Sequence, residues 1–419
     1  MKNSLARDRN NRLRPIYSVC SAHRLVIKAA LDMAARTGKV ALIEATCNQV
    51  NQFGGYTGMQ AADFRGFVVE ISATIPDARF VLGGDHLGPN PWRKLPAAVA
   101  MKHAEDLVAS YVAAGFSKIH LDASMPCADD PEVLPDATIA FRAARLCAAA
   151  EAAVVDNCLP IYVIGTEVPK PGGVVGGLYD VHPTTVEAAT AALLSHKNAW
   201  TAANLGASWS RVVALVVQPG VEFSDDAVAV YRRENGKDLS QWVNTQENIV
   251  FEAHSTDYQP TTALADLVRD SFRILKVGPG LTFALREVLY ALDGIAQVMF
   301  PLSTRKPLRS SLEAIMLEKP EYWLAYFGTG PDASIKRHFS YSDRIRYYWN
   351  EPAATLAVEA LLSELAAVGI PETLVSQYLP DLHAQLPQRK EITAELLIDV
   401  KLRQALSPYV AACTTAEVN

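Results

Sequence analysis

The first 300 residues alternate short apolar runs with alanine-rich helical patterns, and this alternation constrains the fold more than any other feature. Eight runs occur, and most are apolar almost throughout, as parallel strands covered on both faces are. Repeated strand–helix units predict parallel βαβ connections, and eight of them predict an α/β fold of the closed (β/α)8 TIM-barrel type. The runs cover Ile16–Ser21, Val40–Thr46, Phe80–His86, Lys118–Ser124, Ile161–Val168, Val212–Gln218, Ile249–Ser255 and Ile274–Gly280.

An open, doubly wound sheet is the alternative architecture. No G-x-G-x-x-G opens a helix, which disfavours the dinucleotide-binding form of that alternative. After residue 300 the pattern is helical, with no clear strand. We therefore expect a barrel over residues 13–300 and a helical C-terminal region over 301–419 that packs on it. The helical patterns include Leu25–Ala35, Ala97–Ala114, Thr138–Ala152, Thr185–Leu194, Leu264–Phe272, Arg309–Glu318, Asp343–Trp349, Ala353–Ala367, Pro371–Leu379 and Glu391–Ala405.

Composition excludes several classes of partner. Half of the 419 residues are apolar, a fifth are charged, and the net charge is -6 with no basic run, which argues against nucleic-acid binding. No segment approaches the roughly 20 apolar residues that cross a bilayer. No apolar stretch follows the basic N-terminus, so no secretory signal is expected. Six scattered cysteines without a CxxC are expected as free thiols, and a cytoplasmic location follows.

Polar residues end almost every predicted strand, where a barrel of this type carries its chemistry. Because polar groups inside apolar strands cost free energy unless they are bonded, this pattern predicts a shared site. The residues are Glu44 and Asn48 after the second run, Asp85 and His86 after the third, Asp122 after the fourth, Glu167 after the fifth, Gln218 after the sixth, His254, Ser255 and Asp257 after the seventh, and Lys276 and Gly278 after the eighth.

His86 and His254 are the best metal-ligand candidates, since a small barrel brings the ends of its third and seventh strands across one mouth. Imidazole with carboxylate or amide oxygen suits a divalent ion such as Zn²⁺. Gln218 and Glu167 are candidates for the remaining ligands, or for groups that hold a ligand or a substrate hydroxyl. The alternative is that each histidine only caps a loop.

Asp85 is placed to act as general base beside the metal, or else to cap the turn at residues 88–90. Asp122 and Glu167 complete the catalytic candidates. Arg344, together with Arg346, offers a cationic clamp, unless both lie on a solvated helix face. The substrate-binding candidates are Glu44, Asn48, Ser255, Asp257, Gly278 (where barrels often hold phosphate) and Arg344.

Several long motifs carry a resemblance to the GatZ/KbaZ family, and the match runs over most of the chain. The family is named for subunits of tagatose-bisphosphate aldolase, and some stand-alone members are D-tagatose 6-phosphate 4-epimerases. The motifs are LIEATCNQVNQFGGYTGM (residues 42–59), LGGDHLGPNPW (82–92), AGFSKIHLDASMPCADDP (114–131), YVIGTEVPKPGG (162–173), FEAHSTDYQP (251–260) and SYSDRIRYYW (340–349).

The resemblance implies a class II aldolase-like barrel. Compared with catalytic class II aldolases, Asp85 and His86 match a base and a metal ligand, His254 matches a metal ligand, and Glu167 matches a glutamate. Gln218 stands near the place of their remaining metal histidine. The chain has HSTD and KVGPG where those aldolases have HGAS and KVNVAT, so a phosphate is expected to be held differently.

The resemblance implies a metal-dependent isomerase that interconverts D-tagatose 6-phosphate and D-fructose 6-phosphate by a retro-aldol and aldol sequence. The alternative is a non-catalytic stabilising subunit of a class II tagatose-1,6-bisphosphate aldolase. The expected ligand is therefore a small sugar phosphate, and the expected partner is either a second copy of the chain or an aldolase subunit. A kinase is disfavoured because no P-loop or kinase lysine signature occurs.

Overall fold

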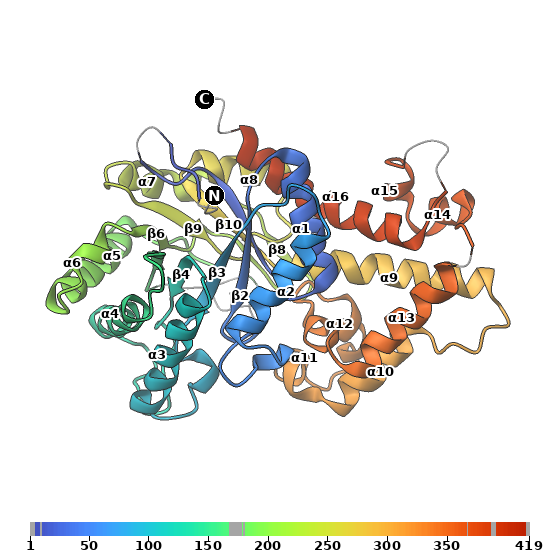
Figure 1. The fold of residues 1–419 in the computed structure, drawn as a ribbon, viewed down its shortest axis with the longest axis horizontal. Helices are drawn as coiled ribbons and strands as arrows, with labels where there is room; N and C mark the ends of the chain where they lie inside the picture. Colours follow the sequence, from blue (N-terminus) through green and yellow to red (C-terminus); the bar gives the residue numbers. More distant parts are fainter. Residues whose placement is uncertain are drawn as a thin grey trace.

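Eight parallel strands close into a barrel in a computed structural model that describes residues 5–8, 11–166, 178, 181–366, 368–386 and 391–415. The α/β barrel type expected from the alternating pattern is confirmed (Figure 1). Each strand pairs with its neighbours along the chain, and β10 closes the ring on β1. The strands are β1 (Ile16–Cys20), β2 (Ala41–Thr46), β3 (Phe80–Leu87), β4 (Lys118–Leu121), β5 (Ile161–Ile164), β6 (Val212–Val216), β9 (Val250–Ala253) and β10 (Phe272–Val277).

Helices cover the outside of the barrel, and a short hairpin of β7 (Glu222–Phe223) and β8 (Val228–Ala229) follows β6. The helical pattern expected over Leu264–Phe272 runs too far, because the helix ends at Arg269 and Phe272 already begins β10. The helices are α1 (Arg24–Thr37), α2 (Ala61–Ala73), α3 (Ala97–Ala113), α4 (Asp136–Ala152), α5 (Val186–Ala202), α6 (Gly206–Trp209), α7 (Arg233–Val243), α8 (Thr261–Arg269) and α9 (Pro279–Met299), with 3-10 turns η1 (Gly55–Thr57) and η2 (Asn90–Trp92).

The barrel interior changes character along its axis. Side chains alternate between the two faces of a strand, so every second residue points inward. Near the amino ends of the strands the inward side chains form an apolar cluster that includes Leu42, Val81 and Val250. Two residues further along the same strands, the inward positions hold Glu44 and Glu252, both fully buried. The apolar layer thus closes the floor beneath a charged layer at the mouth.

The C-terminal region is helical in the part that the structure describes, and its last helix reaches back to the barrel (Figure 1). Helix α16 contacts α1, α8 and α9. The Tyr409 hydroxyl donates to the carbonyl of Thr256, which follows β9 (2.6 Å). The elements are α10 (Leu308–Glu318), η3 (Pro320–Tyr322), α11 (Leu324–Phe327), α12 (Ala333–Phe339), η4 (Arg344–Tyr348), α13 (Pro352–Ala366), α14 (Glu372–Tyr378), α15 (Pro380–His383) and α16 (Ala394–Thr415).

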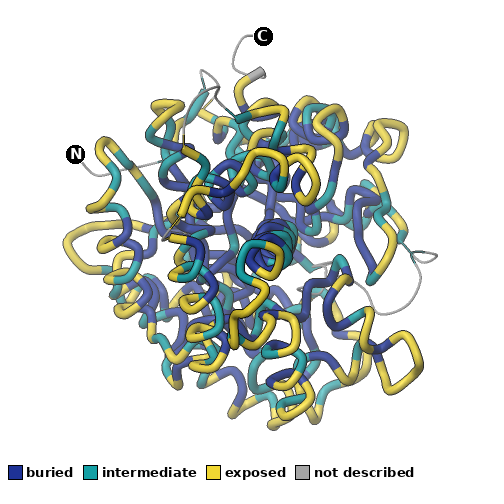
Figure 2. The backbone as a smooth tube through the Cα atoms, turned by 90° about the vertical axis from the view of Figure 1, so that its right-hand side faces the viewer, coloured by how far each residue is buried: buried dark blue, intermediate teal, exposed yellow. Residues whose placement is uncertain are grey.

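Buried backbone fills the interior and exposed residues lie on the outer turns (Figure 2). Among the described residues, no helix combines the length and the apolar character that a membrane span requires. A boundary between barrel and C-terminal region at residue 300 remains a prediction.

Candidate functional site

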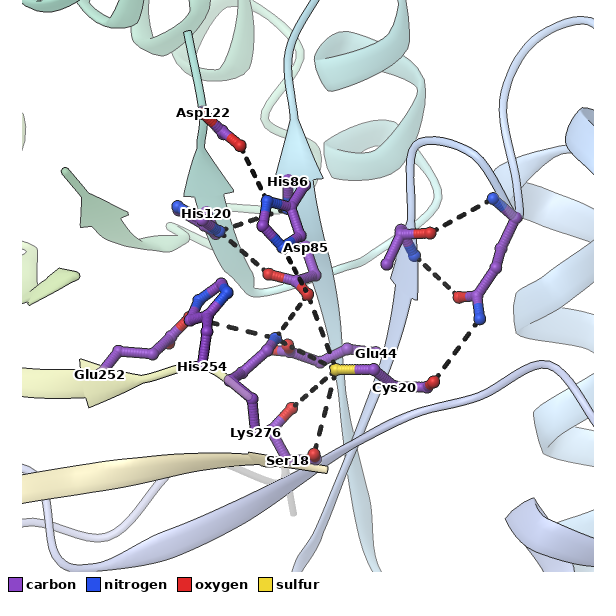
Figure 3. Close-up of polar contacts among 12 residues, drawn as sticks. Ser18, Cys20, Glu44, Asp85, His86, His120, Asp122, Glu252, His254 and Lys276 are labelled. Carbon is purple, nitrogen blue, oxygen red and sulfur yellow. Dashed lines mark hydrogen bonds and ion pairs between the residues drawn. The ribbon is translucent and has the colours of Figure 1, made fainter. Parts of the chain in front are cut away.

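Three imidazoles meet at the carboxyl ends of the barrel strands. The ring centroids of His86 and His254 lie 4.8 Å apart, and His120 lies 5.2 Å from each. Figure 3 shows the three rings around the carboxylate of Asp85. The two histidines expected to share one cavity therefore do so, and His120 joins them from inside β4.

Each ring has one nitrogen close to a carboxylate. His86 Nδ1 lies 2.8 Å from Asp122, His120 Nδ1 lies 2.9 Å from Asp85, and His254 Nε2 lies 2.9 Å from Glu252. Such contacts fix the orientation of an imidazole and leave its other nitrogen free to bind a ligand. The Nε2 atom of His120 is buried and has no hydrogen-bond partner among the described residues.

Two buried lysines link the carboxylates beneath these rings. Lys118 Nζ lies 2.8 Å from Glu44 and 2.6 Å from Glu252. Lys276 Nζ lies 2.9 Å from Asp85 and also contacts Glu44 (Figure 3). We call the whole set the inner cluster; it comprises Glu44, Asp85, His86, Lys118, His120, Asp122, Glu252, His254 and Lys276.

Backbone geometry makes room for the inner cluster. Gly83 has no side chain, and a Cβ there would lie 2.5 Å from the Glu44 carboxylate. A Cβ on Gly88 would lie 1.6 Å from the carbonyl oxygen of Asp122, so only glycine allows β3 and β4 to approach this closely. His86 itself has a φ of 48°, a left-handed conformation that costs energy for a non-glycine residue and that concentrates at functional sites.

The electrostatics favour ionised carboxylates. Burial acts to raise the pKa of Asp85, but His86 and His120 outweigh it and hold that pKa well below its usual range. Burial likewise opposes ionisation of Glu252, yet Lys118 and His254 lower its pKa to about 2. The four carboxylates of the inner cluster outnumber its two ammonium groups, and the imidazoles supply part of the balance: burial acts to lower the pKa of His86, but Asp85 and Asp122 outweigh it and raise that pKa.

The residues present fit a divalent cation. Asp85, His120, Glu252 and His254 each offer a ligand atom, and these atoms lie within 4.8 Å of one another. Nitrogen and carboxylate oxygen together are a ligand set typical of zinc and similar ions. The unpartnered Nε2 of His120 and the excess of carboxylates over ammonium groups also favour a bound cation. The identity of the metal stays a prediction.

A cavity opens above the inner cluster, and most of the expected substrate-binding residues line it. Asn48, Ser255, Asp257 and Gly278 are in its wall, together with Asp85, His86, His254 and Lys276. Glu44 lies deeper, paired with the two lysines.

The C-terminal region completes the wall of this cavity with Arg346 and Tyr347, and the Tyr347 ring packs against Tyr56 from the segment after β2 (ring centroids 4.7 Å apart). We call these three residues the rim. The Arg346 guanidinium donates to the carbonyl oxygens of Ser342 and Asp343 and to the Tyr347 hydroxyl. All these partners are neutral, so the positive charge of Arg346 remains for an anion in the cavity.

Two expected site residues, Gln218 and Arg344, do not reach the inner cluster or the cavity wall. The Gln218 side-chain oxygen accepts from the amides of Gly220 and Val221 (both 2.9 Å), so it caps its own loop and is not placed to bind a metal. Arg344 donates to the Tyr322 carbonyl and packs over Tyr326, so the neighbouring Arg346 takes the expected place. A third expected site residue, Glu167, lies outside the described residues.

Lys118 and His120 were not predicted, because they precede the last polar residues of their strand, and Glu252 stands at the end of its strand but was given no role. The signal that finds them is period-two alternation, since Lys118, His120 and Asp122 occupy every second position of one apolar strand, and Glu252 and His254 do the same. Those positions face the barrel interior.

These features define a (β/α)8-barrel protein with an imidazole–carboxylate cluster at the mouth. Comparison with known proteins gives the family. A model for D-tagatose-1,6-bisphosphate aldolase subunit GatZ/KbaZ-like proteins matches residues 1–414, and the chain belongs to this family. It is 48% identical, over 99% of both chains, to the D-tagatose-1,6-bisphosphate aldolase subunit GatZ of Klebsiella pneumoniae. The resemblance stated from the motifs is thereby confirmed.

Solved structures agree with the fold. A probable tagatose 6 phosphate kinase from Sinorhizobium meliloti superposes with a TM-score of 0.87 and 49% identity, covering 96% of this chain and all of that one. The fructuronate-tagaturonate epimerase UxaE from Cohnella laeviribosi superposes with a TM-score of 0.52 over 95% of this chain and 81% of its own. At 11% identity, that second likeness shows the fold alone.

Proposed function

We propose that the chain is a metal-dependent 4-epimerase that interconverts D-tagatose 6-phosphate and D-fructose 6-phosphate. The inner cluster is the observation that carries this proposal. Burying charged groups costs free energy even when they are paired, and a barrel that only supports another subunit does not need so many of them at its mouth. A cytoplasmic location and a sugar phosphate as ligand belong to the same proposal.

The reaction requires cleavage of a carbon–carbon bond. The C4 proton of a 2-ketose is not adjacent to the carbonyl and is not acidic, so simple proton exchange does not invert this centre. A base takes the C4 hydroxyl proton, C4 becomes an aldehyde, and the electrons of the C3–C4 bond move towards the C2 carbonyl. Rotation of the aldehyde and re-addition on its other face reform the bond and return the proton.

The residues divide these tasks. A divalent cation held by Asp85, His120, Glu252 and His254 would polarise the C2 carbonyl as a Lewis acid. Asp122 orients His86 beside this position. Asp85 contacts both His120 and Lys276, which suits it to holding a cation better than to accepting a proton. We therefore propose Glu167 as the base that takes the C4 hydroxyl proton, with Asp85 as the alternative base.

NMR of the isolated, metal-replete chain with D-tagatose 6-phosphate tests the proposal. We expect D-fructose 6-phosphate to accumulate without triose products, because the cavity must keep both fragments until they recombine. Stable tagatose 6-phosphate over a long incubation, with metal bound, contradicts the epimerase.

An aldolase subunit is the second candidate, and the names of the family and of the GatZ relative favour it. In that case the isolated chain leaves tagatose 6-phosphate unchanged and raises the stability or activity of a separate tagatose-1,6-bisphosphate aldolase when the two are mixed. The same NMR assay, run with and without that aldolase, separates the candidates.

A further inference from the structure

One corner of the cavity, at the ends of β9 and β10, has the parts of an anion site. The backbone amides of Gly278 and Gly280 point into it at the start of α9, which is 21 residues long. In (β/α)8 barrels the loops after the last two strands, with a helix N-terminus, frequently hold phosphate. Free N–H groups and the helix dipole attract negative charge there.

In this chain the side chain of Asp257 already occupies those donors. Its Oδ1 accepts from Gly278 (2.9 Å) and from Gly280 (2.7 Å). Asp257 is 3% exposed and lines the cavity. A Cβ on Gly280 would lie 3.0 Å from the same oxygen, so the carboxylate fits closely against the backbone.

The segment that carries Asp257 is held from two sides. The hydroxyl of the preceding residue, Thr256, donates to the Lys276 carbonyl (2.6 Å), and its own carbonyl accepts from Tyr409 in α16 (2.6 Å). Strand β10 and the C-terminal helix thus both oppose a movement of Asp257 out of the corner.

We infer that Asp257 is a specificity-determining residue that admits a neutral hydroxyl end of the sugar to this corner and excludes a phosphate. A carboxylate accepts hydrogen bonds from a hydroxyl, whereas it repels a phosphate and holds the amides that the phosphate needs. The inference rests on the proposed function and deepens it. The cavity takes a ketose with a single phosphate, for which Arg346 supplies the charge, and rejects the 1,6-bisphosphate.

Calorimetric titration of the full-length, metal-replete protein tests this assignment. The ligands are inorganic phosphate, D-tagatose 6-phosphate and D-tagatose 1,6-bisphosphate. The wild type is expected to bind the bisphosphate no more tightly than the monophosphate. Asp257→Ser frees both amides and is expected to improve binding of the bisphosphate relative to the monophosphate by at least about tenfold. Asp257→Asn keeps a hydrogen-bonding oxygen, removes the charge and should give a smaller shift in the same direction.

Glu222→Gln is the matched control. Glu222 is a buried carboxyl that interacts with Ser255 and Asp257, but its Oε1 accepts from the amide of Phe223 rather than from the loop after β10. Its removal should leave the affinity ratio unchanged. If Glu222→Gln shifts the ratio as much as Asp257→Ser does, then the overall negative charge near the corner decides binding, and not the occupation of the Gly278 and Gly280 amides. That result would overturn the assignment.

Two further outcomes overturn it: a wild type that binds the bisphosphate at least tenfold more tightly than the monophosphate, or a folded Asp257→Ser variant with an unchanged ratio. Failure of the proposed function looks different. If the wild type forms no fructose 6-phosphate but Asp257→Ser gains affinity for inorganic phosphate, the assignment of the corner is supported and the epimerase is not.

Discussion

The inner cluster and the rim lie against the same cavity, yet they are built in opposite ways. The inner cluster comes from the barrel strands and the residues that directly follow them, and its charged groups contact one another in buried pairs. The rim comes from a loop and from the C-terminal region, and its one cation, Arg346, has neutral partners. The comparison teaches that the barrel strands build the buried charged cluster, whereas additions to the barrel build part of the wall of the cavity above it.

The largest effect is expected from removing an imidazole of the inner cluster. His120→Ala and His254→Ala should each lower turnover by about a thousandfold or more, since Lewis-acid stabilisation contributes several kcal/mol to a reaction. Metal content, measured by mass spectrometry, should fall in parallel. His103→Ala, which alters a histidine packed edge-to-face against Phe53 outside the cluster, is the control. Full turnover in a metal-free His254→Ala variant would show that the inner cluster does not take part in the reaction through a bound metal.

Lys118→Met should destabilise the fold by about 3–5 kcal/mol, because it leaves Glu44 and Glu252 buried without their shared cation. Urea unfolding of the metal-free protein measures this loss. Lys102→Met removes an exposed pair with Asp106 and should leave the unfolding midpoint unchanged. Equal midpoints for the two variants would show that the cluster tolerates unpaired charge.

Replacing the two neighbouring arginines one at a time distinguishes the ligand-binding role expected of Arg346 from the structural role expected of Arg344. Arg346→Gln should weaken binding of the sugar phosphate by about tenfold, the effect of losing one charge-assisted contact of about 1.5 kcal/mol. Arg344→Gln should lower thermal stability with little change in affinity, because Arg344 donates to Tyr322 and packs on Tyr326. Titration and thermal unfolding of both variants measure the difference. If Arg344 were the ligand contact instead, Arg344→Gln would weaken binding and Arg346→Gln would mainly lower thermal stability.

The smallest effect is expected at the link between the C-terminal helix and the site. Tyr409→Phe removes the hydrogen bond to the Thr256 carbonyl and should cost about 1 kcal/mol of stability. Thermal unfolding detects the change, and an unaltered midpoint would mean that packing of α16, not this bond, holds the loop after β9.

Much of the barrel was predictable because its signal is local. All eight apolar runs became barrel strands, including short ones such as β5, since a strand buried on both faces must be apolar almost throughout. Boundaries were less certain. The runs expected to end at Val168 and Ser124 form strands only as far as Ile164 and Leu121, because the next residues, Gly165 and Asp122, already begin the loops at the mouth of the barrel.

The sequence by itself determined the barrel and the residues that end its strands, because hydrophobic periodicity and the position of polar groups in a strand are written in neighbouring residues. Only the tertiary structure decided how those residues are used. In the folded chain Gln218 accepts from the amides of its own loop, and Arg346 rather than Arg344 lines the cavity. Asp257 accepts from the amides of Gly278 and Gly280. These choices depend on turns and on contacts between segments far apart in the chain, and no local pattern encodes them.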